Sequence, residues 1–303
     1  YMTASPLTDG STLAIEDTTL TGQHAFYMNG AHLNPGGRMY VRRSTFVAST
    51  AGYYTMYVYG SGGQIDHDGT NRHSVGEVRV YFTAASWNCN FVVMNSDVSN
   101  VNYQQSSTAH VTTNLTIAAI SSTLSYFYAY PGSTTNTNIR AENCIAQYLT
   151  WTAGTMASSN MIASSVTGIS TTVSLSTSTN SNHSILDSTM TSRTYHTIAA
   201  AAGMLTVHNR TTAGYIYLYG THTSGASYII DQCTASTTNT YAMYNTATFT
   251  DSLMEFKRSS FTTTNFYTFA HVAHVRGTSI HRYTNNSITS TYAAVRSVVA
   301  SQP

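Results

Sequence analysis

Apolar and small polar positions recur in one order about every two dozen residues along this chain. An apolar residue comes first, two mixed and two small polar positions follow, and a second apolar residue ends the motif. A repeat of this length is typical of proteins built from stacked structural units. Clear copies start at Ile15, Val41, Val93, Met161, Ile185, Phe256 and Val275, and looser copies start at Thr70, Ala119, Arg140, Val207 and Ile230.

A second pattern follows most copies of the motif, with aromatic and apolar residues at alternate positions. Examples lie at residues 53–59, 126–130 and 215–219. Alternation with a period of two predicts strands, whose side chains point in turn to the core and away from it. Glu and Lys, which favour helices, are almost absent from the repeats. The two patterns together predict an all-β chain in which two or three short strands form each coil of a parallel β-solenoid.

The repeat also predicts how the chain is organised. About twelve coils of about 23 to 24 residues are expected to form a single domain over residues 15–290. Residues 1–14 are expected to be an N-terminal cap or connection, and residues 291–303 a C-terminal tail or cap. We expect one core column to contain Leu20, Phe46, Val75, Val98, Leu124, Ile145, Val166, Met190, Phe261 and Ile280.

The irregular repeat and its stacked Ser, Thr, Asn and Cys positions resemble the right-handed parallel β-helix superfamily. Pectate lyases, viral tailspikes and many surface adhesins belong to it. The resemblance covers nearly the whole chain, but it is one of pattern and includes no diagnostic motif of a single family. It implies a right-handed solenoid whose small polar residues cap turns or form ladders of hydroxyl groups.

The three cysteines are an odd number, so they cannot all pair within the chain. Cys144 and Cys233 lie four repeats apart, which is roughly 19 Å at roughly 4.8 Å per coil. A disulfide needs Cα atoms within about 7 Å of each other. We therefore expect both residues to be buried thiols that fill small spaces in the core.

Composition narrows the functional classes. Only 8% of the residues are charged and the formal net charge is +1, without a run of Lys or Arg, which argues against nucleic acid as a partner. The longest apolar stretch is far shorter than the roughly 20 residues that cross a bilayer. A surface rich in hydroxyls and poor in charge favours an extracellular, cell-surface or virion-surface location. Candidate glycosylation sequons start at Asn114, Asn182, Asn209 and Asn285.

Few residues offer chemistry. Asp187 and Asp231 are the candidate catalytic pair, because two carboxylates roughly 5 to 9.5 Å apart could hydrolyse a glycosidic bond. Asp66 and Asp68 lie in the densest polar segment and are candidate ligands for calcium, the one cofactor that the sequence suggests. In both cases we favour the structural interpretation, in which these side chains cap turns between coils.

Tyrosine is the most informative residue type, with 23 in the chain. At alternate positions of a strand, the tyrosines lie either on one exposed face, where they could bind sugars or another protein, or in the core. We weigh these alternatives equally. The candidate binding surface contains Tyr53, Tyr57, Tyr59, Tyr126, Tyr128, Tyr130, Tyr215, Tyr217 and Tyr219.

The sequence therefore predicts a structural or adhesive β-solenoid on an extracellular or virion surface. Its expected partners are other copies of the chain, other surface proteins or glycans. The solenoid ends are expected to be covered by copies or other domains, because open ends expose unpaired strand edges. The alternative is a tailspike-like or pectate-lyase-like enzyme that degrades polysaccharides.

Overall fold

The computed structural model describes residues 7, 8, 10–34, 36–49, 54–60, 64–68, 72–73, 77–83, 85–107, 109–238, 241–264, 267–271, 274–291, 293–297 and 300–301. Over these residues the chain is all-β and contains no helix. Parallel strands form β-solenoid coils of about ten turns in total, close to the expected twelve, so the predicted fold class is confirmed. The chain divides into two compact units, unit 1 (Tyr1–Thr155) and unit 2 (Met156–Pro303).

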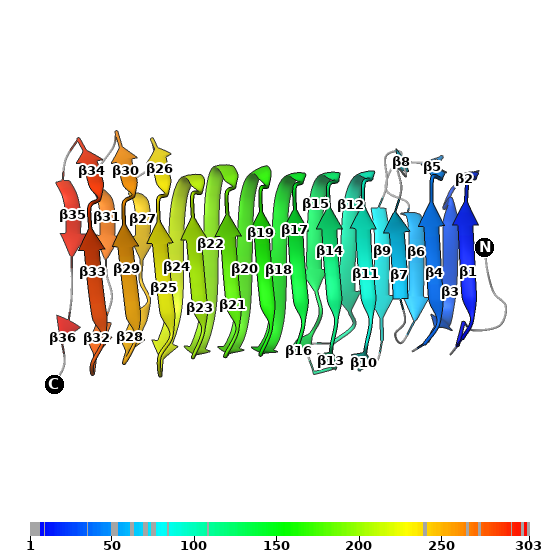
Figure 1. Cartoon of the computed structure of the whole chain (residues 1–303), viewed down its shortest axis with the longest axis horizontal. Helices are drawn as coiled ribbons and strands as arrows, with labels where there is room; N and C mark the ends of the chain where they lie inside the picture. Colours follow the sequence, from blue (N-terminus) through cyan, green and yellow to red (C-terminus); the bar gives the residue numbers. More distant parts are fainter. Residues whose placement is uncertain are drawn as a thin grey trace. The chain divides into compact units, whose positions relative to one another are not determined.

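In unit 1, one strand of each coil has five residues, and these strands pair in parallel to form sheet 1 (Figure 1). Sheet 1 contains β1 (Thr12–Glu16), β4 (Arg38–Arg42), β7 (Gln64–Asp68), β11 (Asn90–Met94), β14 (Thr116–Ile120) and β17 (Asn138–Glu142).

The remaining strands of unit 1 form the other wall of the coils, sheet 2. They are β2 (Thr19–Gly22), β3 (Phe26–Leu33), β5 (Thr45–Ala48), β6 (Tyr54–Gly60), β8 (Arg72–His73), β9 (Glu77–Phe82), β10 (Ser86–Trp87), β12 (Asp97–Gln105), β13 (Val111–Thr113), β15 (Thr123–Tyr130) and β16 (Ser133–Thr135). β18 (Ile145–Ala157) spans the boundary between the units.

Unit 2 repeats the arrangement, and its sheet 1 again consists of parallel five-residue strands. These are β19 (Asn160–Ser164), β21 (Asn182–Leu186), β23 (Leu205–Asn209), β25 (Ser227–Asp231), β29 (Leu253–Lys257) and β33 (Ile280–Thr284). Sheet 2 contains β20 (Thr167–Thr179), β22 (Thr189–Ala202), β24 (Thr212–Thr223), β26 (Thr234–Thr237), β27 (Tyr241–Asn245), β28 (Thr248–Thr250), β30 (Ser260–Thr263), β31 (Tyr267–His271), β32 (His274–Arg276), β34 (Ser287–Ser290), β35 (Ala293–Ser297) and β36 (Ala300–Ser301).

Left-handed corner residues bound the strands of sheet 1. The row after these strands contains Asp17, Arg43, Asn95, Ser121 and Asn143 in unit 1 and Ser165, Asp187, Arg210, Gln232, Arg258 and Asn285 in unit 2, all with φ between 45° and 54°. The row before them contains Gly10, Gly36, Asn88, Asn114 and Asn136 in unit 1 and Ser158, Asn180, Gly203, Ser224, Asp251 and Gly277 in unit 2. Gly, Asn and Asp adopt this conformation most readily, which explains the turn-forming residues of the repeat.

Small polar residues directly after the first row of corners connect one coil to the next. The Ser96 amide donates to Ser122 Oγ at 3.2 Å, and the Cys233 amide donates to Ser259 Oγ at 3.0 Å. Each hydroxyl also donates to the carbonyl two residues earlier, as Ser122 does to Ile120 at 2.8 Å. These ladders satisfy backbone groups that the corners would otherwise leave unpaired.

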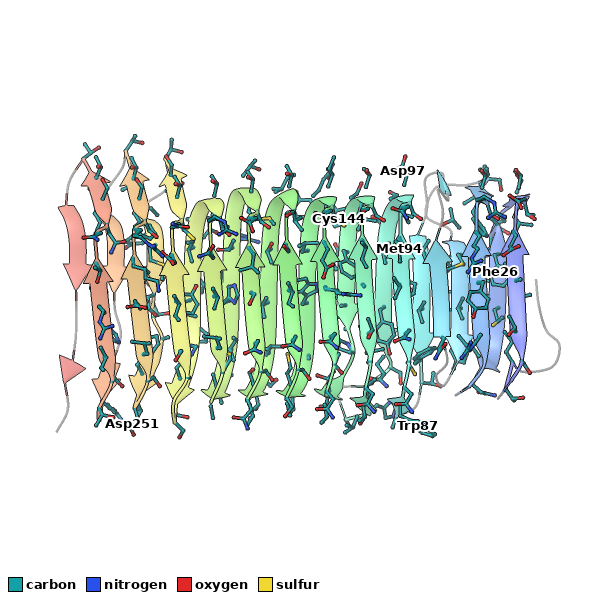
Figure 2. All side chains as sticks on the ribbon, viewed as in Figure 1. Phe26, Trp87, Met94, Asp97, Cys144 and Asp251 are labelled. Carbon is teal, nitrogen blue, oxygen red and sulfur yellow. The ribbon has the colours of Figure 1, made fainter. Side chains whose placement is uncertain are left out.

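Cys144 and Cys233 occupy the same corner position as the ladder hydroxyls. Both thiols are buried and free, and each lies against the carbonyl oxygen two residues earlier, Glu142 at 3.2 Å and Asp231 at 3.4 Å. The predictions that they are buried thiols and are not bonded to each other are confirmed. Figure 2 shows Cys144 among the side chains of unit 1.

The predicted core column is confirmed in part. Leu20 pairs with Phe46, and Val98 pairs with Leu124. Ile145 is 59% exposed, because Ala146, one residue later, pairs with Leu124 in the column. A shift of one residue moves a strand side chain to the opposite face, so the assignment of Ile145 to the core is wrong.

Ile280, the last predicted member of the column, is also 50% exposed, at the start of β33. Gly277, in the copy that starts at Val275, belongs to the row of corners before sheet 1 rather than the row after it. Ile288 pairs with Phe261 and takes the place expected for Ile280.

Met190 is fully buried and pairs with Gly168 in the column. Val166 is buried too, but its amide donates to Ser188 Oγ at 3.1 Å, so it occupies the ladder position and its assignment to the column is wrong. Val75 lies outside the described residues.

Candidate functional site

The tyrosines of unit 1 gather on the outer face of sheet 2. Along β9, Val78 and Val80 are fully buried, whereas Glu77, Arg79 and Tyr81 alternate with them and are half-buried. The strand registers stack such outward positions into three columns, which we call the unit 1 outer face. The columns are Tyr54, Glu77, Asn100, Tyr126 and Tyr148; Tyr57, Arg79, Asn102 and Tyr128; and Tyr59, Tyr81, Gln104 and Tyr130.

Tyrosine rings stack at both ends of the unit 1 outer face. At one end, the ring centroids of Tyr57 and Tyr27 are 5.0 Å apart. At the other end, the Tyr126 centroid lies 4.8 Å from that of Tyr148 and 5.5 Å from that of Tyr128. Stacked phenol rings present flat apolar area with hydroxyl groups at its edge, which complements ligands that have both apolar and hydroxylated surfaces.

In the first two columns, polar side chains from two coils separate these groups of tyrosines. Arg79 donates to the Glu77 carboxylate at 3.0 Å and to the Tyr54 hydroxyl at 2.9 Å. Asn102 is only 8% exposed although it points outward, and the side-chain oxygens of Asn100 and Asn102 are buried without a hydrogen-bond partner among the described residues. An unpaired buried amide oxygen is unfavourable by about 1 to 3 kcal/mol.

Three phenols of the unit 1 outer face, Tyr57, Tyr128 and Tyr130, remain neutral at physiological pH. Burial raises the pKa of Tyr57 to about 12, and burial also raises the pKa of Tyr128 and of Tyr130. Burial has this effect because it disfavours the charged phenolate. These hydroxyls can therefore donate hydrogen bonds as well as accept them.

Unit 2 carries a tyrosine column without polar interruption. Tyr195, Tyr217 and Tyr244 pair in register, with ring centroids 4.3 Å and 5.3 Å apart. Arg193 donates to the hydroxyl of Tyr215 at 3.4 Å. We call these five residues together with Tyr219 and Tyr241 the unit 2 outer face; Tyr219 is 47% exposed and Tyr241 stacks on Tyr244.

Eight of the nine predicted surface tyrosines have described side chains. All eight lie on the outer faces rather than in the core, at positions that alternate with buried residues. The ninth, Tyr53, lies outside the described residues. Their role in binding stays a prediction.

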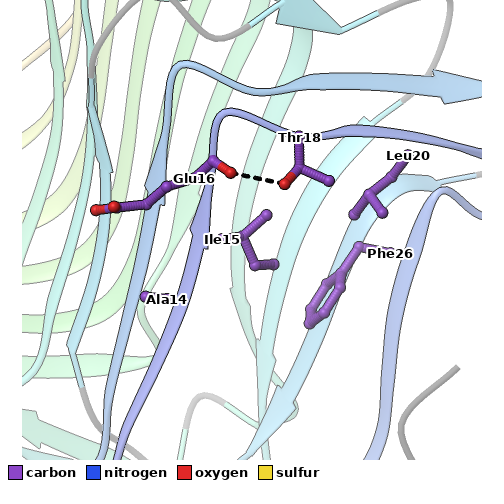
Figure 3. A pocket seen from close by; sticks show the side chains of 6 residues that line it. All are labelled: Ala14, Ile15, Glu16, Thr18, Leu20 and Phe26. Carbon is purple, nitrogen blue, oxygen red and sulfur yellow. Dashed lines mark hydrogen bonds between the residues drawn. The ribbon is translucent and has the colours of Figure 1, made fainter.

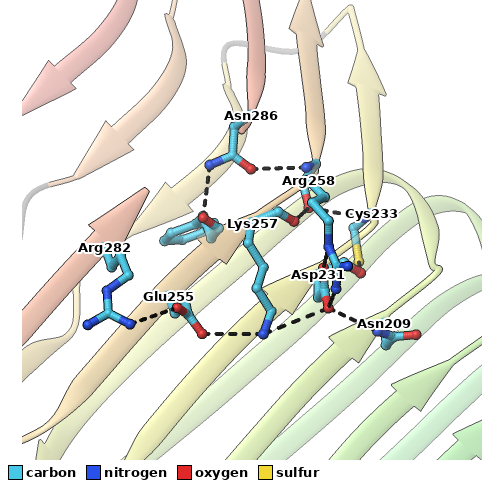
Figure 4. A network of polar contacts seen from close by, with 10 residues as sticks. Asn209, Asp231, Cys233, Glu255, Lys257, Arg258, Arg282 and Asn286 are labelled. Carbon is cyan, nitrogen blue, oxygen red and sulfur yellow. Dashed lines mark hydrogen bonds and ion pairs between the residues drawn. The ribbon is translucent and has the colours of Figure 1, made fainter. Parts of the chain in front are cut away.

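The two candidate catalytic carboxylates are held by different cations. Arg210 forms a bidentate ion pair with Asp187, which lowers the pKa of that carboxyl. Arg258 donates to Asp231 at 2.9 Å, and Lys257 Nζ lies 3.8 Å from its other oxygen (Figure 4). Asp187 is a corner residue, whereas Asp231 ends a strand and pairs with Asn209, so the two belong to different columns. This arrangement favours a structural role for both.

The backbone of the candidate metal ligands Asp66 and Asp68 lies in β7, but their side chains are outside the described part of the chain. Their role in binding calcium stays a prediction. Elsewhere in the described ranges, no three His, Cys, Asp or Glu side chains are placed to hold a metal ion.

Three of the four sequon asparagines are exposed: Asn114, Asn182 and Asn285. Asn114 donates to Asn88, and Asn182 donates to Asn160, both at 3.0 Å between coils. Asn209 is half-buried and donates to Asp231 at 3.5 Å. The exposed side chains are accessible to modification, which stays a prediction.

A hollow of about 520 Å³ lies beside β1 at the start of unit 1 (Figure 3). β1 pairs with β4 on one edge and has no strand on its other edge among the described residues, so no further described coil covers its apolar side chains. The lining of the hollow is therefore mainly apolar. The lining consists of Ala14, Ile15, Glu16, Thr18, Leu20 and Phe26.

The pattern of the sequence failed to identify four buried histidines in unit 2: His183, His196, His208 and His222. The one available signal was a disturbed repeat. The copy assigned to start at Val207 is offset by one residue, because His208 takes the inward position that pairs with Ile185 and Ile230.

Comparison with known proteins assigns no family to the chain. No protein-family model matches it, and a search of curated proteins finds no significant match. Within the described residues there is also no helix with the length and apolar character needed to span a membrane. A functional interpretation therefore depends on the chain's own geometry.

Proposed function

We propose that this chain is a structural and adhesive β-solenoid of an extracellular or virion surface, and that it contacts glycans through its outer tyrosine faces. It is further proposed to be a right-handed member of the parallel β-helix superfamily. The observation that carries the proposal is the stacking of half-buried tyrosines into columns on sheet 2, as for Tyr126 with Tyr148 and Tyr195 with Tyr217. Repeated flat aromatic positions allow many weak contacts to add together.

The chemistry of the unit 1 outer face favours an uncharged glycan. The Arg79 and Glu77 charges neutralise each other, so the face has little net attraction for an acidic polymer. Amide groups at Asn100, Asn102 and Gln104 supply both donors and acceptors for hydroxyl groups. The flanking tyrosines supply the apolar area.

A glycan-binding assay with the purified chain tests the proposal. The double variant Tyr126→Ser/Tyr128→Ser in unit 1 and the triple variant Tyr215→Ser/Tyr217→Ser/Tyr219→Ser in unit 2 are each expected to lose at least tenfold in apparent affinity for neutral polysaccharides. Tyr40→Ser is the matched control, because Tyr40 is a half-buried tyrosine on sheet 1. Unchanged binding in both multiple variants would rule out the tyrosine faces, and release of reducing sugars would favour the enzymatic alternative.

Assembly with other copies is the second part of the proposal. One edge of β1 has no partner strand in the described part of the chain, and an apolar hollow lies beside it. Both features support assembly, since exposed edges favour pairing with another chain. Ile15→Asp and Leu20→Asp are expected to weaken self-association, and light scattering over a wide concentration range measures it. A wild-type chain that stays monomeric throughout that range would contradict the assembly proposal and leave the glycan proposal standing.

A further inference from the structure

Four histidines lie in the core of unit 2, on consecutive strands of neighbouring coils. His183 is in β21, His196 in β22, His208 in β23 and His222 in β24, and none is more than 1% exposed. Their neighbours in the stacked columns are mainly apolar: His208 pairs with Ile185 and Ile230, and His196 pairs with Val173 and Leu218. Histidine thus replaces apolar residues at positions that face the interior of the coils.

The contacts of these imidazoles are those of neutral rings. His208 Nε2 lies 3.1 Å from His196 Nε2 and 3.4 Å from the Tyr228 hydroxyl. A hydrogen bond between two Nε2 atoms needs one of them unprotonated, so the pair cannot both be cations. Ser178 Oγ lies 3.4 Å from His183 Nε2. If a ring took up a second proton, the new N–H group would find no hydrogen-bond acceptor. Nδ1 of all four rings and Nε2 of His222 have no partner among the described residues.

No carboxylate faces the buried histidines from the described strands around them. The titratable groups inside these coils are the histidines themselves, Tyr228 on β25 and the thiol of Cys233, whose pKa burial raises to about 11. The nearby acidic residues, Asp187 and Asp231, form ion pairs with Arg210 and Arg258, and Asp231 is only 6% exposed. β20 contributes Thr171 and Ser178, which carry no charge.

Burial therefore opposes protonation of each ring. It lowers the pKa of His183 and His196 to about 3 and that of His222 to about 4, and it holds the pKa of His208 well below the usual 6.5. In the unfolded chain the same groups bind protons near pH 6.5. Their contribution to stability is present above pH 6.5 and is lost as the pH falls towards 4, since the unfolded state then binds more protons. Carboxylate ion pairs act in a lower range, near pH 4 and below.

We propose that unit 2 contains an acid-responsive element, in which protonation of His183, His196, His208 and His222 opens the coils from β21 to β25 at mildly acidic pH while unit 1 stays folded. The proposal is independent of what the outer faces bind. Opening would also disrupt the unit 2 outer face, because Tyr195 and His196 are adjacent in β22, and Tyr217 shares β24 with His222. Acid would then release whatever that face holds.

The cysteines provide a probe for each unit. Cys233 is buried in unit 2, and Cys89 and Cys144 are buried in unit 1. The full chain is labelled with 4,4′-dithiodipyridine, which reacts with thiols in acid, at pH 7.5 and at pH 5.0, and the labelled peptides are identified by mass spectrometry. Each rate is divided by the rate of the same cysteine in the denatured chain at the same pH.

We expect the normalised rate of Cys233 to rise at least tenfold between pH 7.5 and pH 5.0, with Cys89 and Cys144 almost unchanged. The double variant His196→Leu/His208→Ile matches the neighbouring residues of each column and removes two titrating groups. It is expected to move the pH midpoint of Cys233 exposure down by roughly half a unit or more. His110→Gln, a substitution at a partly exposed histidine of unit 1, is expected to leave that midpoint unchanged.

Three results would overturn the proposal. One is a Cys233 that stays protected at pH 5.0 in the wild-type chain. Another is exposure of Cys89 or Cys144 at the same pH as Cys233, and the third is an unchanged midpoint in the double variant. If the double variant does not fold at pH 7.5, the single variant His208→Ile and the wild-type labelling still decide the question.

Discussion

Units 1 and 2 follow the same coil pattern but place their polar side chains on opposite sides of the wall. In unit 1 the core is aromatic and aliphatic, with Phe91, Phe127 and Trp151 buried, whereas polar residues interrupt the tyrosine columns outside. In unit 2 the outer column of Tyr195, Tyr217 and Tyr244 is continuous, whereas histidines interrupt the core. The corners and hydroxyl ladders are thus common to both units, whereas the chemical character of the residues between the corners differs.

The largest effect is expected from the aromatic core of unit 1. Phe127→Ala should lower the free energy of unfolding by about 3 to 5 kcal/mol, because the fully buried ring packs between Val101 and Leu149 and its removal leaves a cavity. Denaturant unfolding followed by tryptophan fluorescence measures it, since Trp151 is buried in unit 1. Val111→Ala, at a 47% exposed position, should change stability by less than about 0.5 kcal/mol. A similar small change for Phe127→Ala would contradict the packing described.

The core of unit 2 should respond in the opposite direction when a histidine is replaced. His222→Phe is expected to raise the free energy of unfolding by about 1 to 2 kcal/mol at pH 7.5, because neither ring nitrogen of His222 has a partner among the described residues. The ring stacks on Phe249 with centroids 5.0 Å apart, a contact that phenylalanine keeps. Urea unfolding followed by circular dichroism tests this, and a destabilised variant would show that the imidazole makes a favourable polar contact.

Substitutions on the outer faces of the two units should differ less in their effects on the free energy of unfolding than substitutions in the two cores. Tyr217→Ala in unit 2 removes two stacked contacts and should lower the free energy of unfolding by about 1 to 2 kcal/mol. Asn102→Ala in unit 1 should be close to neutral, because the oxygen it removes is buried and unpaired. Thermal unfolding of the two variants side by side measures the difference. Equal losses would mean that the polar and aromatic columns stabilise the sheets to the same extent.

The smallest effect should be common to both units. Ser121 in unit 1 and Ser165 in unit 2 have left-handed corners with φ of 49° and 54°. Replacing either with Gly removes side-chain strain but increases the entropy of the unfolded chain, for a net gain of about 0.5 kcal/mol. Chemical denaturation of Ser121→Gly and Ser165→Gly should give gains that agree within error. A gain in one unit only would show that the corners are not equivalent.

Much of the fold was predictable because the repeat records contacts between neighbouring coils. The parallel solenoid, the hydroxyl ladders and the buried thiols of Cys144 and Cys233 all follow from residues that recur at one position. The corners themselves were missed, since a left-handed residue can be Asp, Asn, Ser, Gln or Arg here. Arg43 and Arg210 are accommodated because each pairs with an Asp of the preceding coil, an interaction that short sequence motifs do not reveal.

Two of the errors share a physical origin, which is that the inward and outward faces of a strand differ by a single residue. Ile145 was assigned to the core although Ala146 occupies it, and Val207 was preferred to His208 because it is apolar. For the candidate binding surface, the alternating sequence pattern showed that the tyrosines of a strand share one face. It did not show whether that face points to the core or to the outside. The polar middle of the unit 1 outer face brings together Arg79 and Asn102 from different coils, so only the register of the strands could identify it.

The two rows of corners also bear on how such a gene can change its length. Wherever the corners are described, the chain enters and leaves the five-residue strand through left-handed residues, and coils of 26 residues (Thr12 to Arg38) and of 22 residues (Asn160 to Asn182) both fit this frame. Recombination between two equivalent corners would therefore add or remove a whole turn and keep every remaining strand in phase. Length variation among descendants of this gene should occur in whole turns, with shorter insertions confined to the segments between the strands of sheet 2.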